Sequence, residues 1–405
     1  MQHLVVFSHL RWNFVYQRPQ HLLSRLARHY RIVFVEEPVL TAEAAHIEAS
    51  SPCAGVDVLR PHTTIDAAGF HDDQLASLQP LVCDYLSERG VTDYLVWLYT
   101  PMALPMLNGL SPRAVVYDCM DELAAFKNAP RQMKQRETAL LKRADVVLTG
   151  GPRLYEAKRP FNPSTLCLPS AVDAAHYSAE RARGDAQAME RAHALQGLIE
   201  GPRLGFFGVI DERIDLDLVA QVADADPDWQ VIMVGPVVKI DPAHLPQRPN
   251  LHWLGAQPYD LLPQLVAGWD VCLMPFALNE STAFISPTKT LEYMAAGKPV
   301  VSTAVHDVKV LFGDVVAIAD RGGAFIDACR AQLAETPVQA RERSVRVQAC
   351  VRRYSWEKTA EAVHEALVAA VDKEQVRRAT ESDVAMVERG RGSLSVPAKQ
   401  RISAA

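Results

Sequence analysis

Residues 286–303 read SPTKTLEYMAAGKPVVST, and the order of residue types predicts a loop, a helix, a tight turn and a buried strand. Ser286 and Pro287 are typical of a helix start, because a hydroxyl can cap free backbone N–H groups and proline fits the first helical position. Gly297 predicts the end of the helix, and Pro299 cannot continue it. The stretch therefore predicts a helix that leads into a strand of an α/β fold.

Lys289 and Glu292 lie in the first turns of this predicted helix. The helix dipole is positive at the N-terminus, so a lysine there is slightly unfavourable for the helix, and we expect Lys289 to serve an anionic ligand such as a phosphate. Glu292 could accept hydrogen bonds from a ribose diol. The alternative is a solvated helix face with local ion pairing.

The length and composition bound the class of protein. A chain of 405 residues favours two or more domains over a single core. A formal net charge of -6 gives no general attraction to nucleic acid, so we expect no nucleic-acid partner. The seven cysteines are scattered without C-x-x-C spacing, which predicts neither a zinc site nor a disulfide framework and favours a cytoplasmic location. The N-terminus predicts a first strand and not a signal peptide, and no apolar run has the length of a membrane span.

Short apolar runs alternate with amphipathic segments along the chain, a pattern typical of parallel sheets built from strand–helix–strand units. We expect two doubly wound, Rossmann-like α/β domains over 1–172 and 202–354, joined at 173–201 by an exposed connector or a helix. A further helix is expected at 355–373, followed by a disordered tail at 374–405. Because ligands bind beyond the carboxyl ends of parallel strands, the two domains would face each other across a central cleft.

The second predicted domain opens with FFGVIDERID, residues 206–215. Gly208 ends the first strand and would let a ligand approach the backbone. Arg213 follows in the loop, where its guanidinium could hold a diphosphate through two parallel bonds. The alternative is that Arg213 pairs with Asp211 or Asp215 at the surface. A P-loop and a G-x-G-x-x-G fingerprint are both missing, which disfavours nicotinamide and flavin chemistry.

Three further loops carry candidate side chains after predicted strands. Asn279, Glu280, Ser281 and Thr282 offer donors and acceptors that suit a hydroxyl-rich ligand, or they form an irregular surface loop. The loop after the first strand holds His9, Arg11, Trp12 and Arg18, in which the aromatic ring could stack on a sugar or pack in the core. Asp118 and Asp121 end another strand, where either could act as a general base or orient a sugar hydroxyl. Asp121 could equally cap the next helix.

The two predicted Rossmann-like halves, the helix introduced by YSWE at 354–357 and the Lys289/Glu292 helix together resemble GT-B glycosyltransferases over residues 1–371. Within that fold the chain is similar to the retaining family-four group, in particular to bacterial teichuronic-acid and polysaccharide glycosyltransferases. Ser-Pro-x-Lys-x-x-Glu-Tyr before Gly-Lys-Pro-Val-Val is the most specific part of the resemblance. The helix after Trp356 resembles the one that crosses back to the first domain as a hinge.

The resemblance implies transfer of a sugar from a nucleotide-diphosphate donor in the second domain to a saccharide or lipid-linked acceptor in the first, with no metal ion or other cofactor. Glu292 resembles the second glutamate of the E-x7-E motif, which binds the nucleotide ribose. Lys289 and Arg213 resemble the cations that hold the donor diphosphate. A lipid-linked acceptor would bring the chain to the inner face of the membrane, and the oligomeric state is left open.

One residue departs from the family pattern, since Phe284 stands where the first glutamate of E-x7-E would be. Glu280 or Asn279 could take over that role. In a retaining reaction the leaving diphosphate can take the acceptor proton and Asp118 would position hydroxyls, whereas an inverting reaction would use Asp118 or Asp121 as the base. Two other functions stay open, a nucleotide-sugar epimerase and a non-catalytic nucleotide-sugar-binding protein.

The expected site draws side chains from both domains. The catalytic candidates are Asp118, Asp121, Arg213 and Lys289. The donor-binding candidates are Gly208, Arg213, Asn279, Glu280, Ser281, Thr282, Ser286, Thr288, Lys289, Thr290 and Glu292. The acceptor-binding candidates are His9, Arg11, Trp12 and Arg18, and no metal ligands are expected.

Overall fold

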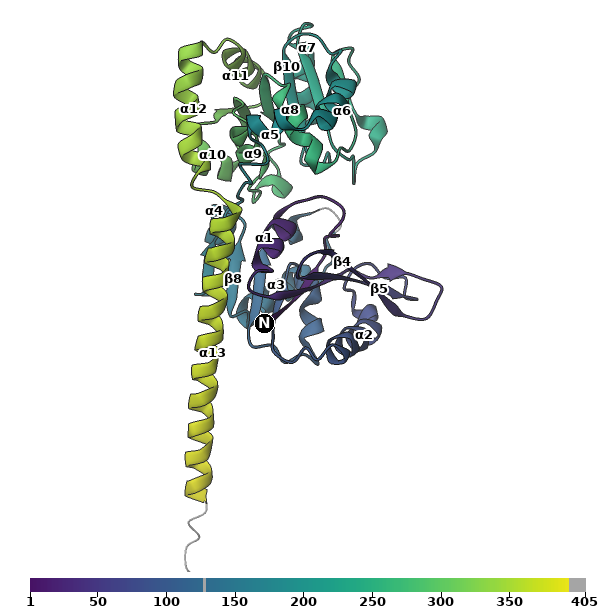
Figure 1. Ribbon diagram of the computed structural model, residues 1–405, viewed down its shortest axis with the longest axis vertical. Coiled ribbons are helices and arrows are strands. Elements are labelled where there is room, and N and C mark those ends of the chain that lie inside the picture. Colours follow the sequence, from purple (N-terminus) through teal and green to yellow (C-terminus); the bar gives the residue numbers. More distant parts are fainter. Residues whose placement is uncertain (127–128, 393–405) are drawn as a thin grey trace, which may run out of the picture.

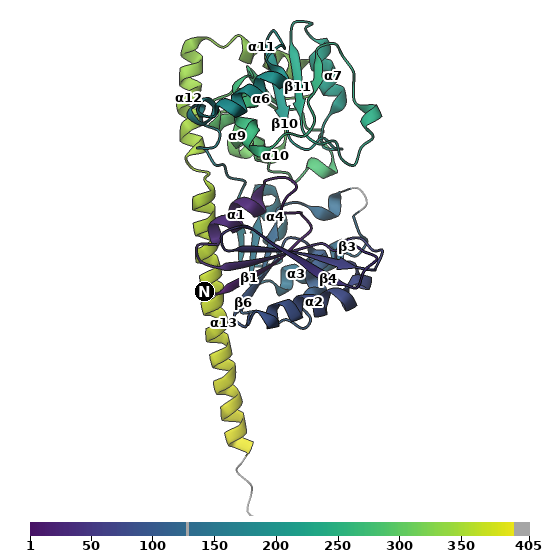
Figure 2. The same cartoon turned by 45° about the vertical axis from the view of Figure 1, so that its right-hand side comes forward.

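The computed structural model describes the backbone of residues 1–126 and 129–392 and the side chains up to residue 377. Figure 1 shows two bodies, one above the other, with the long helix α13 (Trp356–Gly392) running down the side of the lower body and past it. The lower body holds the N-terminal sheet and the upper body holds the second sheet, and Figure 2 shows the same separation from another side. The expected α/β class with two Rossmann-like halves is confirmed.

The first sheet is assembled mainly from parallel strands in the order β3-β5-β2-β1-β6-β7-β8-β9. Its strands are β1 (His3–Ser8), β2 (Arg31–Glu36), β3 (Val39–Leu40), β4 (His46–Cys53), β5 (Val56–Thr63), β6 (Tyr94–Leu98), β7 (Val115–Cys119), β8 (Val146–Thr149) and β9 (Thr165–Cys167). Central strands such as β6 and β7 are buried along their whole length, which explains their unbroken apolar sequences. β4, which is largely exposed, pairs antiparallel with the more buried β5, and β4 is the strand that the sequence pattern did not predict.

The second sheet has the order β12-β11-β10-β13-β14-β15, and its neighbouring strands run parallel. Its strands are β10 (Arg203–Phe207), β11 (Gln230–Val234), β12 (Leu251–Trp253), β13 (Val271–Met274), β14 (Val300–Thr303) and β15 (Ala317–Ala319). The strand order reverses beside β10, the first strand of the domain. Such a switch point opens a crevice at the carboxyl ends of the strands, where α/β domains bind their ligands.

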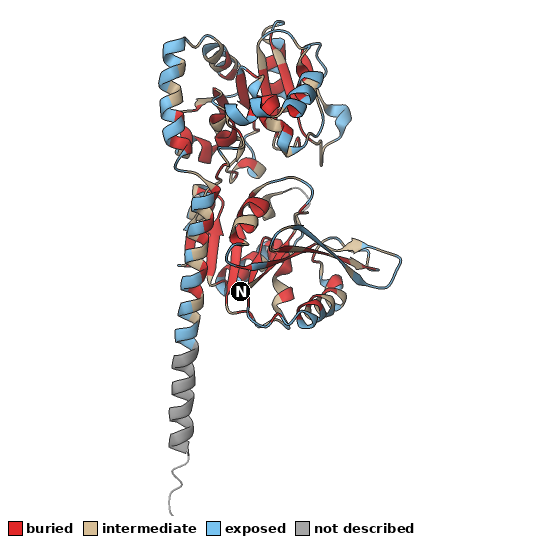
Figure 3. Ribbon diagram, viewed as in Figure 1, coloured by how far each residue is buried: buried red, intermediate tan, exposed pale blue. Residues whose placement is uncertain are grey.

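Helices cover both sheets, whose central strands are buried in Figure 3 while the outer faces of the helices are exposed. The first domain has α1 (Arg18–Leu26), α2 (Leu75–Glu88), α3 (Met133–Arg143), α4 (Pro152–Lys158) and 3-10 helices at Asp72–Gln74, Pro101–Leu107 and Leu123–Ala125. The second has α7 (Leu216–Asp224), α8 (Leu262–Ala267), α9 (Lys289–Ala295), α10 (His306–Phe312), α11 (Gly323–Leu333), α12 (Pro337–Val351) and 3-10 helices at Pro242–His244, Tyr259–Leu261 and Glu280–Thr282. In the described part of the chain, no helix combines the length and the apolar character needed to cross a bilayer.

Two predicted segments differ from the structure. The segment at 173–201 is helical, as one of the two alternatives had it, with α5 (Ala179–Gly184) and α6 (Ala186–Gln196). It is not an exposed connector, because buried side chains, Tyr177 among them, join the core of the second domain. The tail expected from residue 374 begins instead as helix, because α13 continues without a break to Gly392, and the rest of that tail lies outside the described residues. Trp356 and the apolar face that follows it pack into the first domain's core, so α13 does cross back to that domain.

The helix that carries Lys289 and Glu292 begins later than its sequence indicates. α9 starts at Lys289 after Thr288, and the hydroxyl of Ser286 is not the helix cap. Ser286 instead lies at the boundary between the domains, where its carbonyl accepts a 2.7 Å hydrogen bond from Ser170. The other end follows the prediction, since Gly297 adopts the left-handed conformation with φ of 75° directly after the helix.

Candidate functional site

A cavity of about 480 Å³ opens between the domains at the carboxyl ends of β1, β10 and β11. One wall is the loop between β1 and α1, residues 12–17, and the opposite wall is built by the second domain. The second domain lines it with Phe207, Gly208, Val209, Arg213, Val234, Gly235, Pro236, Ala256, Gln257, Pro258, Tyr259, Leu262, Thr288, Lys289 and Glu292. The expected cleft therefore exists. Five of the donor-binding candidates line it, namely Gly208, Arg213, Thr288, Lys289 and Glu292.

Two glycines bring the backbone close to the cavity. Gly208 and Gly235, after β10 and β11, have φ of 136° and 149°, a region that residues with a side chain rarely adopt. A Cβ on Gly235 would lie 1.8 Å from the carbonyl oxygen of Gly208, and a Cβ on Gly208 would lie 2.0 Å from Cε of Lys289. Glycine is thus needed at both positions to let the strand ends and the lysine side chain share this space.

Lys289 places an ammonium group in this cavity wall. Its Nζ lies 5.7 Å from the ring centroid of Phe206, and in the described residues it forms no ion pair within 4.0 Å. Burial and the charge of Arg213 lower the pKa of Lys289 to about 8, against the opposing charge of Glu292. A cation that is costly to bury and lacks a direct partner is what an anionic ligand would stabilise.

Glu292 lies one turn further along α9 and is only 8% exposed. Burial raises the pKa of its carboxyl to about 7, while Lys289, Tyr177 and Thr288 act in the opposite direction. The alternative of a solvated helix face is therefore wrong for this pair. The carboxylate faces the same cavity as Lys289 and can accept hydrogen bonds from a ligand there.

Arg213 is held in the cavity wall by Asp211. Its Nε lies 2.9 Å and its Nη2 2.7 Å from the two carboxylate oxygens of Asp211, which is itself buried. This pairing was the alternative considered from sequence, yet it does not remove Arg213 from the site. The guanidinium still lines the cavity and its charge acts on Lys289, and Nη1 has no hydrogen-bond acceptor in the described part of the chain. Asp211 thus fixes the arginine in position.

The first domain contributes Asp121 to the opposite side. Burial raises the pKa of this carboxyl, and the nearby charges of Arg213, Lys239 and Lys289 counteract that shift. Lys239 follows β11 with φ of 62°, a strained conformation for a lysine, and its Nζ lies 4.8 Å from the ring centroid of Phe126. Sequence reasoning missed Lys239, because nothing in the loop after β11 marks a lysine that reaches across to the first domain.

Comparison with known proteins places this geometry in a family. Residues 201–335 match the family described as Glycosyl transferases group 1. The match covers the second domain and not the whole chain. The matched range begins just before β10 and ends after α11, so it contains Gly208, Arg213, Lys289 and Glu292, the residues that surround the cavity.

Relatives and solved structures extend the likeness to both domains. The chain is 29% identical over 221 residues to a putative teichuronic acid biosynthesis glycosyltransferase, TuaH, of Bacillus subtilis, which covers 51% of this chain and 54% of the relative. The chain thus matches about half the length of that curated relative. Sucrose-phosphate synthase from Thermosynechococcus elongatus superposes with a TM-score of 0.68 at 17% identity, covering 91% of this chain and 100% of the other. HepE from Anabaena, solved with UDP and glucose, gives 0.66 at 15% identity with the same coverage, and these matches establish the GT-B fold.

The polar loop at 279–282, which precedes α9, does not line the cavity. Asn279 and Thr282 cap a 3-10 helix in a reciprocal hydrogen-bonded box, and the hydroxyl of Ser281 lies 2.6 Å from Asn279. Glu280 is exposed to solvent. Thr290 is fully buried with its hydroxyl against the sulfur of Met274. The prediction that these five side chains contact a donor does not fit the structure, since local capping and core packing already use them.

Ser286 likewise turns to the domain boundary, and so does Phe284, the residue that departs from the E-x7-E pattern. Phe284 packs against the core of the first domain, with the guanidinium of Arg153 5.7 Å from its ring centroid. The position that would carry the first glutamate of the motif is therefore an inter-domain packing site in this chain. Glu280 is not placed in the cavity to replace it.

Arg18 and Asp118 bind each other inside the first domain. Arg18 Nε lies 3.1 and 3.0 Å from the two carboxylate oxygens of Asp118, and both side chains are almost fully buried. Nη1 of Arg18 donates to the carbonyl of Leu168, which ties the pair to the end of β9. The predictions that Arg18 contacts a ligand and that Asp118 handles acceptor hydroxyls do not hold in this geometry, because each charge is neutralised by the other.

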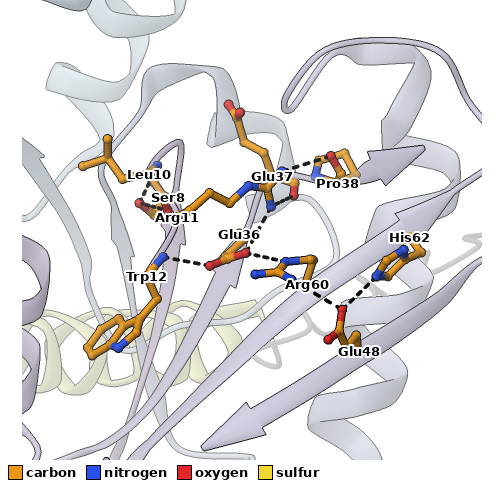
Figure 4. Close-up of polar contacts among 10 residues, drawn as sticks. All are labelled: Ser8, Leu10, Arg11, Trp12, Glu36, Glu37, Pro38, Glu48, Arg60 and His62. Carbon is orange, nitrogen blue, oxygen red and sulfur yellow. Dashed lines mark hydrogen bonds and ion pairs between the residues drawn. The ribbon is translucent and has the colours of Figure 1, made fainter. Parts of the chain in front are cut away.

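Arg11 and Trp12 are also engaged within the first domain. Figure 4 shows Arg11 and Arg60 converging on Glu36, at 3.1 and 2.9 Å, while the backbone N–H of Trp12 donates to the same carboxylate at 2.8 Å. Glu36 is fully buried and so fixes the start of the loop that walls the cavity. Arg11 is used to hold that loop, whereas the indole of Trp12 packs on Phe34 and also reaches the cavity wall.

His9 is an acceptor candidate whose imidazole lies within the electrostatic reach of Lys239. Burial and the charge of Lys239 lower the pKa of its imidazole to about 4, so the ring is neutral at physiological pH. Its Nδ1 is buried and has no hydrogen-bond partner among the described residues. The structure thus brings His9 and Asp121 toward cations of the second domain and places Trp12 in the cavity wall, whereas Arg11, Arg18 and Asp118 are engaged in internal pairs.

Proposed function

We propose that this chain is a glycosyltransferase that moves a sugar from a nucleotide-diphosphate donor, bound by the group 1 domain, to a saccharide or lipid-linked acceptor held by the first domain. The observation that carries the proposal is the convergence of Lys289, Arg213 and Glu292 on one cavity at the strand ends. The HepE structures with UDP, glucose or UDP-glucose and the trehalose-6-phosphate structure with UDP-2-fluoro glucose share this fold. They support a nucleotide-sugar donor here.

The cations account for the main part of the catalytic effect. Departure of the sugar leaves negative charge on the diphosphate, and fixed cations stabilise that charge without rearranging. Arg213 is fixed by Asp211, and Lys289 is fixed by close packing against Gly208. Because the pKa of Lys289 is about 8, the residue is charged at neutral pH, and a bound diphosphate would raise its pKa further. In this proposal the two side chains take the place of a metal ion.

Glu292 would accept the ribose hydroxyls. Its raised pKa, about 7, means that the carboxyl is poised between its protonated and ionised forms when the cavity is empty. Hydrogen bonds donated by a diol favour the ionised form, so ligand binding and ionisation of Glu292 support each other. The proximity of Lys289 on the preceding turn adds to that effect.

The acceptor side supports a retaining reaction, in which the leaving diphosphate takes the acceptor proton. Asp118 is paired with Arg18 in the core and is not available as a base. Asp121 is the first-domain carboxyl that faces the cations, where it would orient an acceptor or donor hydroxyl. A lipid-linked acceptor would bring the chain to the cytoplasmic face of a membrane, whereas a soluble saccharide would not.

Calorimetry with UDP, GDP and ADP tests the donor site directly. We expect one of these nucleotides to bind the wild-type chain and Lys289→Ala and Glu292→Ala to abolish or sharply weaken that binding without unfolding the protein. Unchanged affinity in both variants, with the wild type binding normally, would show that the donor lies elsewhere.

Product analysis separates the proposed activity from its two rivals. Incubation with the matching nucleotide sugar and a panel of saccharide and lipid-linked acceptors should give a glycosylated product. An epimerase would return an altered nucleotide sugar, and a non-catalytic binder would leave the donor intact. The packing of Phe284 against the first domain makes the binder the rival to test first.

A further inference from the structure

A column of stacked rings crosses from the first domain to the second beside the cavity. Tyr16, in the loop after β1, stacks on Tyr259 at a centroid distance of 4.9 Å and an angle of 25°. On its own side Tyr16 meets His21 edge to face at 4.6 Å, and His21 stacks on Trp356 at 4.7 Å. Tyr259 stacks in turn on His176 at 4.1 Å. The cavity wall formed by the first domain is therefore joined to the second domain through Tyr259.

Tyr259 also stands next to the carboxylate expected to bind ribose. Its ring lies 6.0 Å from that of Tyr177 in a perpendicular arrangement, and Tyr177 comes from the segment between the domains. Burial raises the pKa of both phenols, and the charge of Glu292 adds to the shift. Tyr259 and Glu292 line the same cavity, and both phenol hydroxyls are buried.

We propose that Tyr259 is a positioning residue that links Tyr16 to Glu292, so that the carboxylate is held for its ligand only while the loop of the first domain lies against the second domain. The inference rests on the proposed function for the identity of that ligand, a nucleoside diphosphate. It adds that the first domain takes part in nucleoside binding, although Tyr16 belongs to the domain assigned to the acceptor.

The physical link is the exclusion of water. Tyr16, Tyr259 and Glu292 line the same cavity. Removing the Tyr16 ring leaves Tyr259 without its stacking partner from the first domain and opens the loop wall further to solvent. Water would then solvate the carboxylate of Glu292 and compete with the ligand for its hydrogen bonds.

Nucleotide calorimetry on a matched set of variants tests the link. Tyr16→Ala should weaken binding of UDP, GDP or ADP by about threefold to tenfold, the range expected for loss of an aromatic pair. Tyr16→Phe retains the ring and should bind as the wild type does. Phe161→Ala, which removes an exposed aromatic side chain of the same domain, is the control. In a Tyr259→Ala background, Tyr16→Ala should have no further effect.

A second measurement needs no ligand. The pKa of Glu292, followed by ¹³C NMR of labelled glutamate and assigned with Glu292→Gln, should fall toward its ordinary value in Tyr16→Ala and stay raised in Tyr16→Phe. The titratable groups that face this carboxyl are Lys289, Tyr177, Tyr259 and Tyr293. All four are left unmutated in every sample of this titration.

Calorimetry and the NMR titration together distinguish a failure of the proposed donor site from a failure of the proposed role of Tyr259. If the wild type binds no nucleotide, the proposed donor fails, and the NMR titration alone decides whether Tyr16 controls Glu292. If the wild type binds but Tyr16→Ala changes neither affinity nor the pKa of Glu292, the positioning role of Tyr259 is overturned. Additive losses in the double variant would also contradict it.

Discussion

The two sides of the cleft use their charged residues differently. On the second-domain side, Lys289, Arg213 and Glu292 converge on the cavity. On the first-domain side, Arg18 forms an ion pair with Asp118, and Arg11 forms an ion pair with Glu36 and donates hydrogen bonds to nearby carbonyls. Both sides show the same sequence pattern, a charged loop after a buried strand. The difference teaches that such a pattern locates a cleft, whereas the partners of each charge decide whether it can bind a ligand.

The largest expected effect is on stability, and it lies in the first domain. Asp118→Ala leaves the guanidinium of Arg18 buried without its partner, which should lower the free energy of unfolding by about 3 to 5 kcal/mol. Urea unfolding followed by circular dichroism measures the loss. Replacing both residues with leucine or methionine should recover most of it, because an apolar pair needs no charge compensation. A single variant as stable as the wild type would show that this pair does not hold the domain together.

The corresponding change in the second domain should weaken nucleotide binding and leave stability unchanged. Lys289→Ala removes a charged hydrogen-bond donor from the proposed diphosphate site, which should weaken nucleotide binding by about 10- to 100-fold, or roughly 1.5 to 3 kcal/mol. Its unfolding free energy should not fall, since burial already disfavours the charged form. Lys309→Ala, at an exposed position on α10, is the control for loss of a lysine. A Lys289 variant that unfolds more easily but binds normally would make the residue structural.

The pH dependence of nucleotide binding should show two limbs. On the alkaline side Lys289, with a pKa of about 8 in the empty site, loses its proton, and affinity should fall by about tenfold between pH 7 and pH 9. On the acid side Glu292, with a pKa of about 7, takes up a proton and loses its capacity to accept from ribose. Calorimetry across this range should give a maximum between the two pKa values.

Variants of the two residues show which group causes each limb of the pH profile. Glu292→Gln should remove the acid limb and Lys289→Gln the alkaline one, each with weaker binding at the optimum. A profile of the wild type that is flat from pH 6 to pH 9 would show that neither group titrates in the site.

The smallest effect is expected at Arg11. Its side chain is 34% exposed and shares Glu36 with Arg60 and the Trp12 backbone, so Arg11→Ala should cost only about 0.2 to 1 kcal/mol. Nucleotide affinity should not change. Chemical denaturation and calorimetry check the two statements. A loss of sugar transfer with unchanged stability and nucleotide binding would return Arg11 to the acceptor site.

The fold was predictable because its signals are local. Alternating apolar and amphipathic runs set the order of strands and helices, and Gly208 and Gly297 mark conformations that residues with a Cβ avoid. Strand β4 escaped prediction, since it is largely exposed and lacks a clear apolar period. The burial of the segment after residue 173 was not predicted, because alanine-rich helices bury small side chains such as Ala188 and Ala192 that leave little hydrophobic pattern.

The site was predictable only in its second-domain half. Lys289 and Glu292 sit at fixed spacing on one helix, so their shared face follows from the sequence. The contributions of Lys239, Tyr259 and Tyr177 could not be inferred, because each reaches the site from a different loop. The same limit applies to Thr282 and Asn279, whose capping role depends on the turn they form.

By itself the sequence determined the two-domain α/β architecture, the glycine at position 208 after a strand and the helix that carries Lys289 and Glu292, since these depend on residues near one another in the chain. Tertiary structure alone decided that Arg18 pairs with Asp118, 100 positions away, and that Phe284 packs into the other domain. It also decided that Tyr16 meets Tyr259 across the cleft. Burial strengthens an electrostatic interaction only between groups that folding brings together, and the chain's local pattern does not specify which distant groups these are.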